Sequence, residues 1–389
     1  MLINQLPDDC LLSIFLFVGD LDDTINCYKV CDRWKRLISY RLSKVNFLEG
    51  ASSSSTDKHD CRMDKIYFHK TDKLPDIDLS QLLPSLKVVD LDTPLCKKLG
   101  RDEIIKLLAT AESIKGANFE PRNMMRHMTH DSLENLEMLA TCDLDSYYII
   151  VPDNGVKIKQ LVLKEYYAFD FAHHARHFPN LKRLRIENCD GLPDGFYEGP
   201  ILKNLEILEL GLSSYYGTDE YIGFRFMDSC PALRSAFHFI SENRFFVDIS
   251  VKNFNMQDLV IHYSYDQNWV SLKRLLTKYP NLKHLALKNN CKIQDEHVKE
   301  MVAMLPKLCL LDLRGSPRVT KYAADFVDQY CQRHGRTIKF YHYLKDDRIY
   351  SDWPQLSTKV ERISRGFDFM KHCFLKQFGQ IPVFMVPYD

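Results

Sequence analysis

The sequence lacks the features that mark membrane proteins and nucleic-acid-binding proteins. No apolar run approaches the roughly 20 residues that a helix needs to span a bilayer. Lysine plus arginine number 52 and aspartate plus glutamate also number 52, so the net charge is zero. A polyanionic partner requires a basic excess or a basic patch. We therefore expect neither a membrane nor a nucleic acid as a partner.

The 12 cysteines lack the spacing of metal sites and redox motifs, because no two of them form a Cys-x-x-Cys pair. The apolar stretch Cys10 to Val18 superficially resembles the core of a secretory signal. However, Asp8 and Asp9 precede it, and no basic residue or small-residue cleavage site accompanies it. We expect reduced thiols and a location in the cytoplasm, the nucleus or both.

No motif in the sequence indicates catalysis. His173 and His177 have the i, i+4 spacing of a helical metal-ligand pair, but no complementary ligand pair accompanies them, so an ordinary surface helix is the favoured interpretation. No glycine-rich stretch has the spacing of a phosphate-binding loop. We predict a non-catalytic protein without a cofactor or a metal.

The first forty residues carry apolar patterns with helical spacing. Pro7 suits the first turn of a helix, and Asp8 and Asp9 complement the positive end of its dipole. The first pattern comprises Leu11, Ile14, Phe15 and Val18. The second comprises Cys27, Val30, Cys31 and Trp34, and it continues at Leu37 and Ile38. Two or three helices of this size cannot bury a sufficient core alone, so they need a partner surface.

These residues resemble an F-box. The resemblance lies in Leu6-Pro7, Asp9, Ile14-Phe15, Asp20-Leu21, Val30-Cys31, Trp34-Lys35 and Leu37. It implies binding to a Skp adaptor, which in turn binds the cullin scaffold of a ubiquitin ligase. By position in the motif, the implied adaptor-binding residues are Leu6, Pro7, Ile14, Phe15, Val30, Cys31 and Trp34. The alternative is a helical cap that seals the end of the repeats that follow.

Beyond the run Gly50-Ala51-Ser52-Ser53-Ser54-Ser55-Thr56, a leucine pattern recurs. An apolar residue, two variable residues, an apolar residue, one variable residue and another apolar residue follow one another about eleven times. Clear copies begin at Leu86, Leu181, Leu205, Leu282 and Leu308. The copy around Leu233 is degraded, with Ala236 and His238 in its apolar slots. The starts are about 22 to 28 residues apart, which matches the period of leucine-rich repeats.

The segments between these copies have helical patterns, so strand, turn and helix alternate. The sequence therefore predicts an α/β fold: a leucine-rich-repeat solenoid, in the form of a horseshoe with concave parallel strands and convex helices, preceded by a small all-α unit. The predicted divisions are an F-box-like unit at 1–48, a flexible linker at 49–60, the solenoid at 61–343 and a C-terminal tail at 344–389. Since an end repeat exposes its core and a strand edge, we expect the tail to cap it.

The variable residues of the strands are predicted to form the concave face. They include Arg183 and Arg185, and their mixture of charged and apolar types suits a protein partner. A tyrosine series follows the strands along one edge, and we take it as the first place to look for a target. The alternatives are a solvated strand face and loop packing between repeats. The candidate target-binding residues are Tyr166, Tyr167, Arg183, Arg185, Tyr215, Tyr216, Tyr263 and Tyr265.

Two functions follow from these patterns. The first is the substrate-recognition subunit of a Skp–cullin–F-box ubiquitin ligase, which holds an unknown target protein near the ligase. The second is a leucine-rich-repeat scaffold outside any ligase, whose N-terminal helices serve as a cap.

Overall fold

The computed structural model describes residues 3–50, 63–68, 78–91, 95, 99–119, 124–188, 194–212, 220–242, 244–264, 268–290 and 292–388. The chain folds into two compact units, Met1–Ile158 and Lys159–Asp389.

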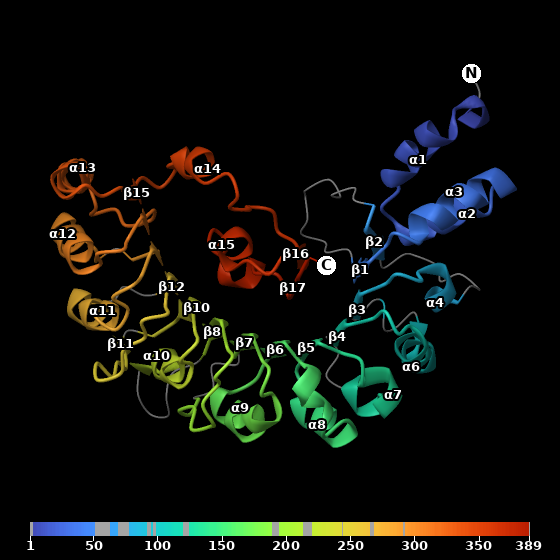
Figure 1. Ribbon diagram of the computed structural model, residues 1–389, viewed down its shortest axis with the longest axis horizontal. Helices are drawn as coiled ribbons and strands as arrows, with labels where there is room; N and C mark the ends of the chain where they lie inside the picture. The colour runs from blue at the N-terminus through green and yellow to red at the C-terminus, as the bar shows by residue number, and fades with distance from the viewer. Residues whose placement is uncertain are drawn as a thin grey trace. The chain divides into compact units, whose positions relative to one another are not determined.

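The first unit begins with three α-helices (Figure 1). They are α1 (Asp8–Leu16), α2 (Leu21–Tyr28) and α3 (Asp32–Leu42), and a 3-10 turn, η1 (Ile3–Gln5), precedes them. Pro7 is the N-cap of α1, and Asp20 caps α2 by accepting a hydrogen bond from the Asp23 N–H. The second apolar pattern spans two helices, because the chain leaves α2 after Tyr28 and enters α3 at Asp32. Val30 and Cys31 therefore lie in the connection, where both are exposed.

Five parallel strands follow in the first unit. They are β1 (Phe47–Gly50), β2 (Lys65–Phe68), β3 (Val88–Leu91), β4 (Gly116–Phe119) and β5 (Met138–Thr141). Strand β1 pairs with both β2 and β3, so β2 lies outside it. The predicted linker started at 49, but Glu49 and Gly50 are buried residues of β1. The rest of the predicted linker, 51–60, lies outside the described residues.

Short helices connect the strands of the first unit. They are α4 (Leu79–Leu82), α6 (Arg101–Thr110), η2 (Met125–His127), α7 (His130–Leu133), α8 (Leu144–Ile150) and η3 (Asn154–Lys157). Their apolar sides are buried, as Ile104, Leu107 and Leu108 show for α6.

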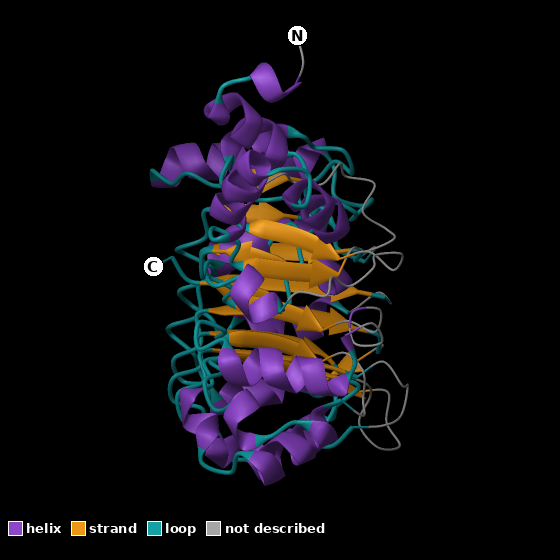
Figure 2. Ribbon diagram, turned by 90° about the vertical axis from the view of Figure 1, so that its right-hand side faces the viewer, coloured by secondary structure: helices purple, strands orange, loops and turns teal. Residues whose placement is uncertain are grey.

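The second unit contains eight parallel strands in sequence order. They are β6 (Gln160–Lys164), β7 (Arg183–Glu187), β8 (Ile207–Gly211), β10 (Ser235–Ile240), β12 (Asp258–Tyr263), β13 (His284–Lys288), β14 (Leu310–Asp312) and β15 (Lys339–Tyr341). Figure 2 shows these strands running side by side in one direction. A separate pair, β9 (Glu220–Tyr221) and β11 (Arg244–Phe245), joins two of the loops.

The helices of the second unit pack against one face of the strands (Figure 1). They are α9 (Ala168–His174), η4 (Ala175–His177), α10 (Gly223–Phe226), η5 (Met227–Ser229), α11 (Trp269–Leu276), α12 (Asp295–Met304) and α13 (Lys321–His334). The leucines of neighbouring repeats stand in register, as in the pairs Leu184 with Leu208 and Leu285 with Leu311. This alternation of strand and helix confirms the predicted repeat architecture.

The degraded repeat keeps the register of its neighbours. Ala236 stands opposite Leu208 and Leu259 in the ladder, and His238 takes a leucine slot. His238 is buried, and its Nδ1 lies 2.7 Å from the hydroxyl of Tyr221. Burial lowers the pKa of His238 to about 3, so its ring is neutral at physiological pH. A neutral imidazole with a hydrogen-bond partner can occupy an apolar slot.

Small polar residues follow strands β13 and β14. Asn290 and Ser316 are both buried, and the Asn290 side chain accepts a hydrogen bond from the Lys292 N–H. It thereby satisfies a backbone group of the turn.

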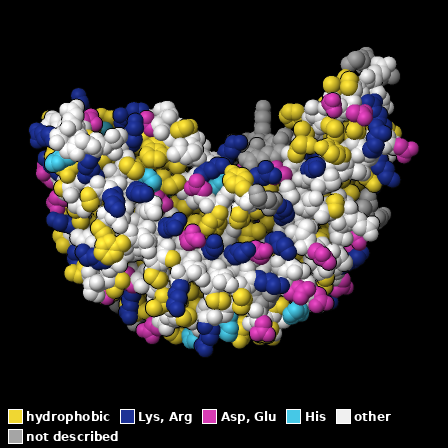
Figure 3. All heavy atoms as spheres, viewed as in Figure 1, with side chains coloured by type: hydrophobic (Ala, Val, Ile, Leu, Met, Phe, Trp, Pro, Cys, Tyr) yellow, Lys and Arg dark blue, Asp and Glu magenta, His cyan; other side chains and the backbone are white. Residues whose placement is uncertain are grey.

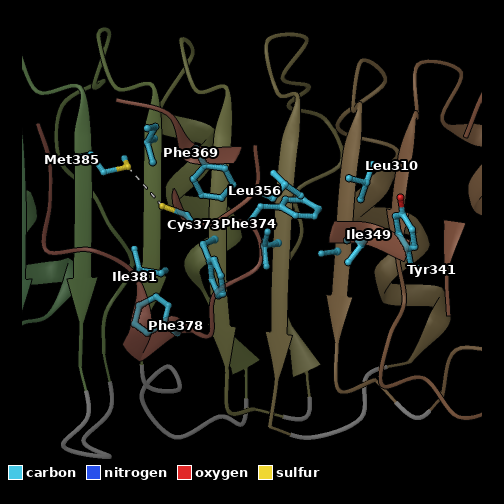
Figure 4. Close-up of a cluster of buried hydrophobic side chains, with 14 residues drawn as sticks. Leu310, Tyr341, Ile349, Leu356, Phe369, Cys373, Phe374, Phe378, Ile381 and Met385 are labelled. Carbon is cyan, nitrogen blue, oxygen red and sulfur yellow. Dashed lines mark hydrogen bonds between the residues drawn. The ribbon is translucent and has the colours of Figure 1, made fainter. Parts of the chain in front are cut away.

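The C-terminal tail lies across the strand face opposite the helices, and not merely at the end of the array as predicted for a cap. Its elements are α14 (Arg348–Asp352), β16 (Ile363–Arg365), α15 (Phe369–His372), η6 (Phe378–Gln380) and β17 (Phe384–Val386). Strands β16 and β17 form a parallel pair of their own. Tail side chains including Phe374 and Met385 form one buried cluster with Val260, Ala286 and Leu310 of the strands (Figure 4). The physical reason is that the strand face is itself partly apolar, so covering it with the tail removes apolar surface from water.

Within the described residues, no helix has the length and apolarity required to cross a membrane. Figure 3 shows basic, acidic and apolar side chains interspersed on one face of the molecule.

Candidate functional site

The starts of α1 and α3 are held together by Arg33. Its guanidinium donates to the Leu6 carbonyl at 2.6 Å and to the Asp8 carboxylate at 2.7 and 2.8 Å. The adjacent Trp34 donates its indole N–H to the Asn4 side chain at 2.8 Å. These bonds bring the Leu6-Pro7 pair next to the Cys31–Trp34 stretch. Residues that the F-box resemblance implies for adaptor binding are thereby assembled from two distant parts of the motif.

This arrangement also fixes a charge at the start of α1. The hydrogen bond from Arg33 lowers the pKa of Asp8, and the charges of Arg33 and Arg36 add to the effect. Asp8 is therefore ionised at neutral pH, where it complements the positive end of the helix dipole. The sequence did not indicate that Arg33 binds Asp8. An acidic residue beside Leu-Pro and a basic one beside Trp was the available signal.

Several of the predicted adaptor-binding residues present apolar surface. Ile14 is 39% exposed and Val30 is 56% exposed. Pro7 and Cys31 are also exposed, while Leu6 and Trp34 are half-buried. Phe17, which follows α1 and was not among the predicted residues, is 75% exposed. The helical unit thus presents large apolar side chains to solvent.

Phe15 has a different position. Its side chain is 1% exposed, and its ring meets the Trp34 ring edge to face with centroids 4.9 Å apart. Leu11, Ile38 and Leu42 of the same unit are buried as well. In this structure Phe15 therefore holds α1 against α3, and it offers a partner almost no surface.

The two candidate arginines of the strand face are buried beneath the tail. Arg183 is wholly buried and pairs with Glu209 at 2.8 Å. It also donates to the tail carbonyls of Pro382 and Val383, at 2.6 and 2.9 Å. Arg185 donates to the carbonyls of Ile381 and Phe378, at 3.0 and 3.1 Å. Neither guanidinium is open to a target while the tail is in place.

Two further strand residues bind the tail main chain. The Gln160 side chain donates to the Met385 carbonyl at 2.6 Å and accepts from the Met385 N–H at 3.1 Å. The ammonium group of Lys288 donates hydrogen bonds to the carbonyls of Phe374 and Lys376. Burial lowers the pKa of Lys288 to about 7. Both are variable residues of their strands, and the sequence gave no sign that the tail would cover them.

A histidine lies nearby at the start of β13. His284 Nδ1 is 2.5 Å from the Asp258 carboxylate, which also accepts from the Ser235 hydroxyl at 2.6 Å. Burial by itself would lower the pKa of His284, but hydrogen bonds and charges from Asp258 and Cys309 outweigh it and raise the pKa to about 9. The His284 ring therefore carries a positive charge at neutral pH and forms an ion pair.

The predicted tyrosine edge is only partly described. Tyr166 and Tyr263 are buried, and Tyr167 is half-buried. The burial of the first two favours loop packing, the alternative that the sequence left open. Tyr215, Tyr216 and Tyr265 lie outside the described residues.

Among the described residues, no group of three or more potential metal ligands comes together. Helix α9 ends at His174, and a 3-10 turn carries His177. The ring of His173 packs against Phe169, with centroids 5.0 Å apart. The i, i+4 histidine pair is therefore not on one continuous α-helix.

A family model described as F-box-like matches residues 3–44. The N-terminal helical unit is F-box-like. The matched stretch runs from η1 to the end of α3 and contains the Arg33 clamp and all seven predicted adaptor-binding residues. No curated protein matches the chain.

Several solved structures are similar to the chain. They include a TLR13–ssRNA13 complex, with 13% identity, a TM-score of 0.44 and coverage of 78% of this chain and 44% of that one. The leucine-rich-repeat-containing protein LegL7 from Legionella pneumophila has 15% identity, a TM-score of 0.37 and coverage of 61% and 79%. The Rad7 and Elc1 complex in yeast has 15% identity, a TM-score of 0.40 and coverage of 81% and 90%. The chain thus spans less than half the length of the first of these.

Proposed function

We propose that this chain is the substrate-recognition subunit of a Skp–cullin–F-box ubiquitin ligase. Its F-box-like unit binds a Skp-type adaptor, and its leucine-rich repeats hold a target protein. The observation that carries the proposal is the exposed apolar surface of the F-box-like unit, above all Ile14 and Val30. A unit that buries Phe15 yet leaves these two side chains in water has a surface suited to a partner.

The energetics of such a surface favour a stable complex. Burying apolar area contributes about 25 cal/mol per Å², and central interface anchors typically cost about 2 kcal/mol or more when truncated. The Arg33 clamp adds preorganisation, because Leu6 and Pro7 are already held against the start of α3. Less conformational entropy is then lost on binding.

The proposed mechanism is one of proximity. The subunit performs no bond-making step; it raises the effective concentration of target lysines near the charged ubiquitin. The cullin scaffold is reached through the adaptor, and the proposed site of action is the cytoplasm, the nucleus or both.

Calorimetric titration with a purified Skp adaptor tests the proposal. The wild-type chain should bind with micromolar affinity or better, and Ile14→Asp combined with Val30→Asp should weaken binding at least 100-fold. Ile201→Asp is the matched control, since Ile201 is also an exposed aliphatic residue but lies in the second unit. It should leave the affinity unchanged. Circular dichroism of each variant checks that the chain stays folded.

Failure of the wild-type chain to bind the adaptor would sink the ligase proposal and favour the second candidate, a repeat scaffold capped by its N-terminal helices. A specific observation favours that candidate. The Tyr67 N–H of β2 donates to the Gly19 carbonyl at 2.8 Å, and Asp20 forms a bridge with Tyr67. The helical unit thus continues the hydrogen bonding of the first strands, as a cap does.

Trp34→Ala is less suited to the adaptor-binding test than Ile14→Asp and Val30→Asp, because Trp34 packs against the buried Phe15.

A further inference from the structure

The tail is bound to the strand face through main-chain hydrogen bonds as well as through buried side chains. Arg183, Arg185 and Lys288 donate to six tail carbonyl groups, and Gln160 bonds both the N–H and the carbonyl of Met385. Every amino acid offers the same carbonyl group. These hydrogen bonds therefore recognise a main chain, which is partly in the 3-10 turn η6, and do not themselves depend on the identity of the side chains.

Side-chain contacts accompany these bonds, both at Phe378 and Ile381 and at Phe369 and Phe374 before them. The Phe378 ring lies over the Arg185 guanidinium at 4.8 Å and meets the rings of Phe237 and Phe239 with centroids at 5.7 and 6.0 Å. Ile381, three residues later, is buried in the same cluster. The face therefore accepts an aromatic side chain and, three residues further on, an aliphatic one (Figure 4).

The polar character of this face points to intermittent exposure. A buried ion pair such as Arg183–Glu209 is often no more stabilising than well-packed apolar residues of the same volume. Such a pair is therefore not explained by stability alone. A face that meets water at times is solvated without penalty when it carries charged groups, and it can still bind a peptide main chain through them.

An exposed stretch divides the part of the tail beside β15 from the part on the strand face. Ser357 marks the end of the part that packs beside β15, where Asp352 bonds Lys339 and Tyr341. The residues Thr358, Lys359 and Val360 that follow are exposed. Beyond them, β16 and β17 pair with each other, so this part of the tail has internal order of its own.

We propose that the strand face from β6 to β10 is a peptide-binding face, which the chain's own segment Gln377–Val386 occupies in cis. A target binds there by displacing this segment with an uncharged stretch that has an aromatic residue followed three positions later by an aliphatic one. This inference rests on the target-binding half of the proposed function. It does not depend on the adaptor-binding half.

A cleavable chain tests the proposal. A specific protease site is inserted between Thr358 and Lys359 of the full-length chain, and binding of a fluorescent synthetic peptide of Gln377–Val386 is followed by anisotropy. The uncut chain should not bind the peptide, because the tethered segment holds the site. In the cut chain, the peptide should displace the chain's own copy of Gln377–Val386 and bind with a micromolar Kd. The circular dichroism of the repeats should be retained.

Variants locate the binding within the strand face. Arg185→Ala should weaken peptide binding to the cut chain at least tenfold, and so should alanine in place of the peptide's Phe378 and Ile381. Lys283→Ala is the matched control, because Lys283 is an exposed cation just before β13 and bonds Gln257 outside the tail contacts. It should leave the Kd unchanged.

Two results would overturn the proposal. One is a cut chain that keeps its segment and excludes the peptide under native conditions. The other is loss of the repeat structure as soon as the segment leaves, which would make the tail a permanent part of the core. Adaptor binding is measured on the uncut chain, so a failed adaptor experiment leaves the peptide result fully interpretable.

Discussion

Arg183 on β7 and Glu209 on β8 form an ion pair of 2.8 Å in which neither side chain is exposed to solvent. Removing one partner of a buried pair leaves an unpaired charge, which typically costs about 3–5 kcal/mol. We therefore expect Arg183→Met to lower the free energy of unfolding by this amount in urea titrations. The double variant Arg183→Met, Glu209→Leu should recover most of the loss.

The exposed pair Lys182–Glu206 on the same two repeats is the control for this prediction, since its side chains are 51% and 32% exposed. Surface pairs contribute about 0–1 kcal/mol, so Lys182→Met should change the urea midpoint little. Equal losses for Lys182→Met and Arg183→Met would contradict the assignment of Arg183 as a buried, paired charge.

Phe374 tests whether the tail is a separate cooperative element. Its side chain is wholly buried between tail and strands, and Phe→Ala at such a site typically costs about 3–5 kcal/mol. We expect Phe374→Ala to lower hydrogen-exchange protection in the tail beyond Ser357 while β12 and β13 stay protected. Leu285→Ala, in the repeat core, should reduce protection in the strands themselves. Equal loss in both regions for Phe374→Ala would mean that tail and repeats unfold together.

His284 predicts a loss of stability as the pH rises. Its folded-state pKa is about 9, above the roughly 6.5 of an unfolded histidine. Its contribution is therefore fully present below pH 6.5 and is lost between pH 6.5 and 9. The stability advantage of the wild type over His284→Gln should shrink by roughly 2–3 kcal/mol between pH 6 and pH 9. Urea midpoints at the two pH values measure this difference, and a constant difference would rule out the His284–Asp258 ion pair.

For Lys288 we expect the opposite pH dependence, in which stability rises with pH. Burial lowers its pKa to about 7, well below the roughly 10.4 of an unfolded lysine. Its contribution is therefore present at high pH and is lost as the pH falls toward 7. Relative to Lys288→Met, the wild type should gain stability from pH 7 to pH 9.

The groups that face Lys288 are Asp312 and Arg314 of the repeats and Cys373 and Lys376 of the tail. Burial also lowers the pKa of Lys376, to about 8, so this residue contributes a slope of the same sign in both proteins. Identical pH profiles of the wild type and Lys288→Met would show that the ammonium group is not desolvated by the tail.

A substitution at Arg33 tests whether its hydrogen bonds preorganise the F-box-like unit for adaptor binding. Arg33→Lys keeps the charge but loses the planar fork that reaches Leu6 and Asp8 together. We expect a roughly tenfold weaker adaptor affinity with an unchanged melting temperature of the repeats. Arg36→Lys is the control, because Arg36 is 71% exposed and makes a single 3.0 Å contact with Asp8. If both variants bind alike, Arg33 does not preorganise the site.

The repeats were predictable because their signal is local and repeated. Each strand places leucines at fixed offsets, and even Ala236 and His238 could be assigned to their slots from the neighbouring copies. Strand β1 was missed because it comes before the first copy and ends at Gly50, where the composition indicates a flexible joint.

The position of the tail was not predictable from local patterns. Arg183 reaches the carbonyls of Pro382 and Val383, about 200 residues away in the sequence. A main-chain carbonyl leaves no trace in the sequence, because every residue has one. The F-box-like motif differs from the tail, because the motif itself indicated which residues belong together. The structure was needed to show that Phe15 is buried while Ile14 is exposed.

The short passage from α3 to β1 has a mechanical consequence. Helix α3 ends at Leu42 and strand β1 begins at Phe47, and β2 is tied to Gly19 and Asp20 by hydrogen bonds. The helical unit is therefore rigidly mounted on the first strands and has no slack at this joint. An assembly attached to it would be held at one fixed angle to these strands, so inserting a single residue between Leu42 and Phe47 would re-aim the attached assembly without altering any binding surface.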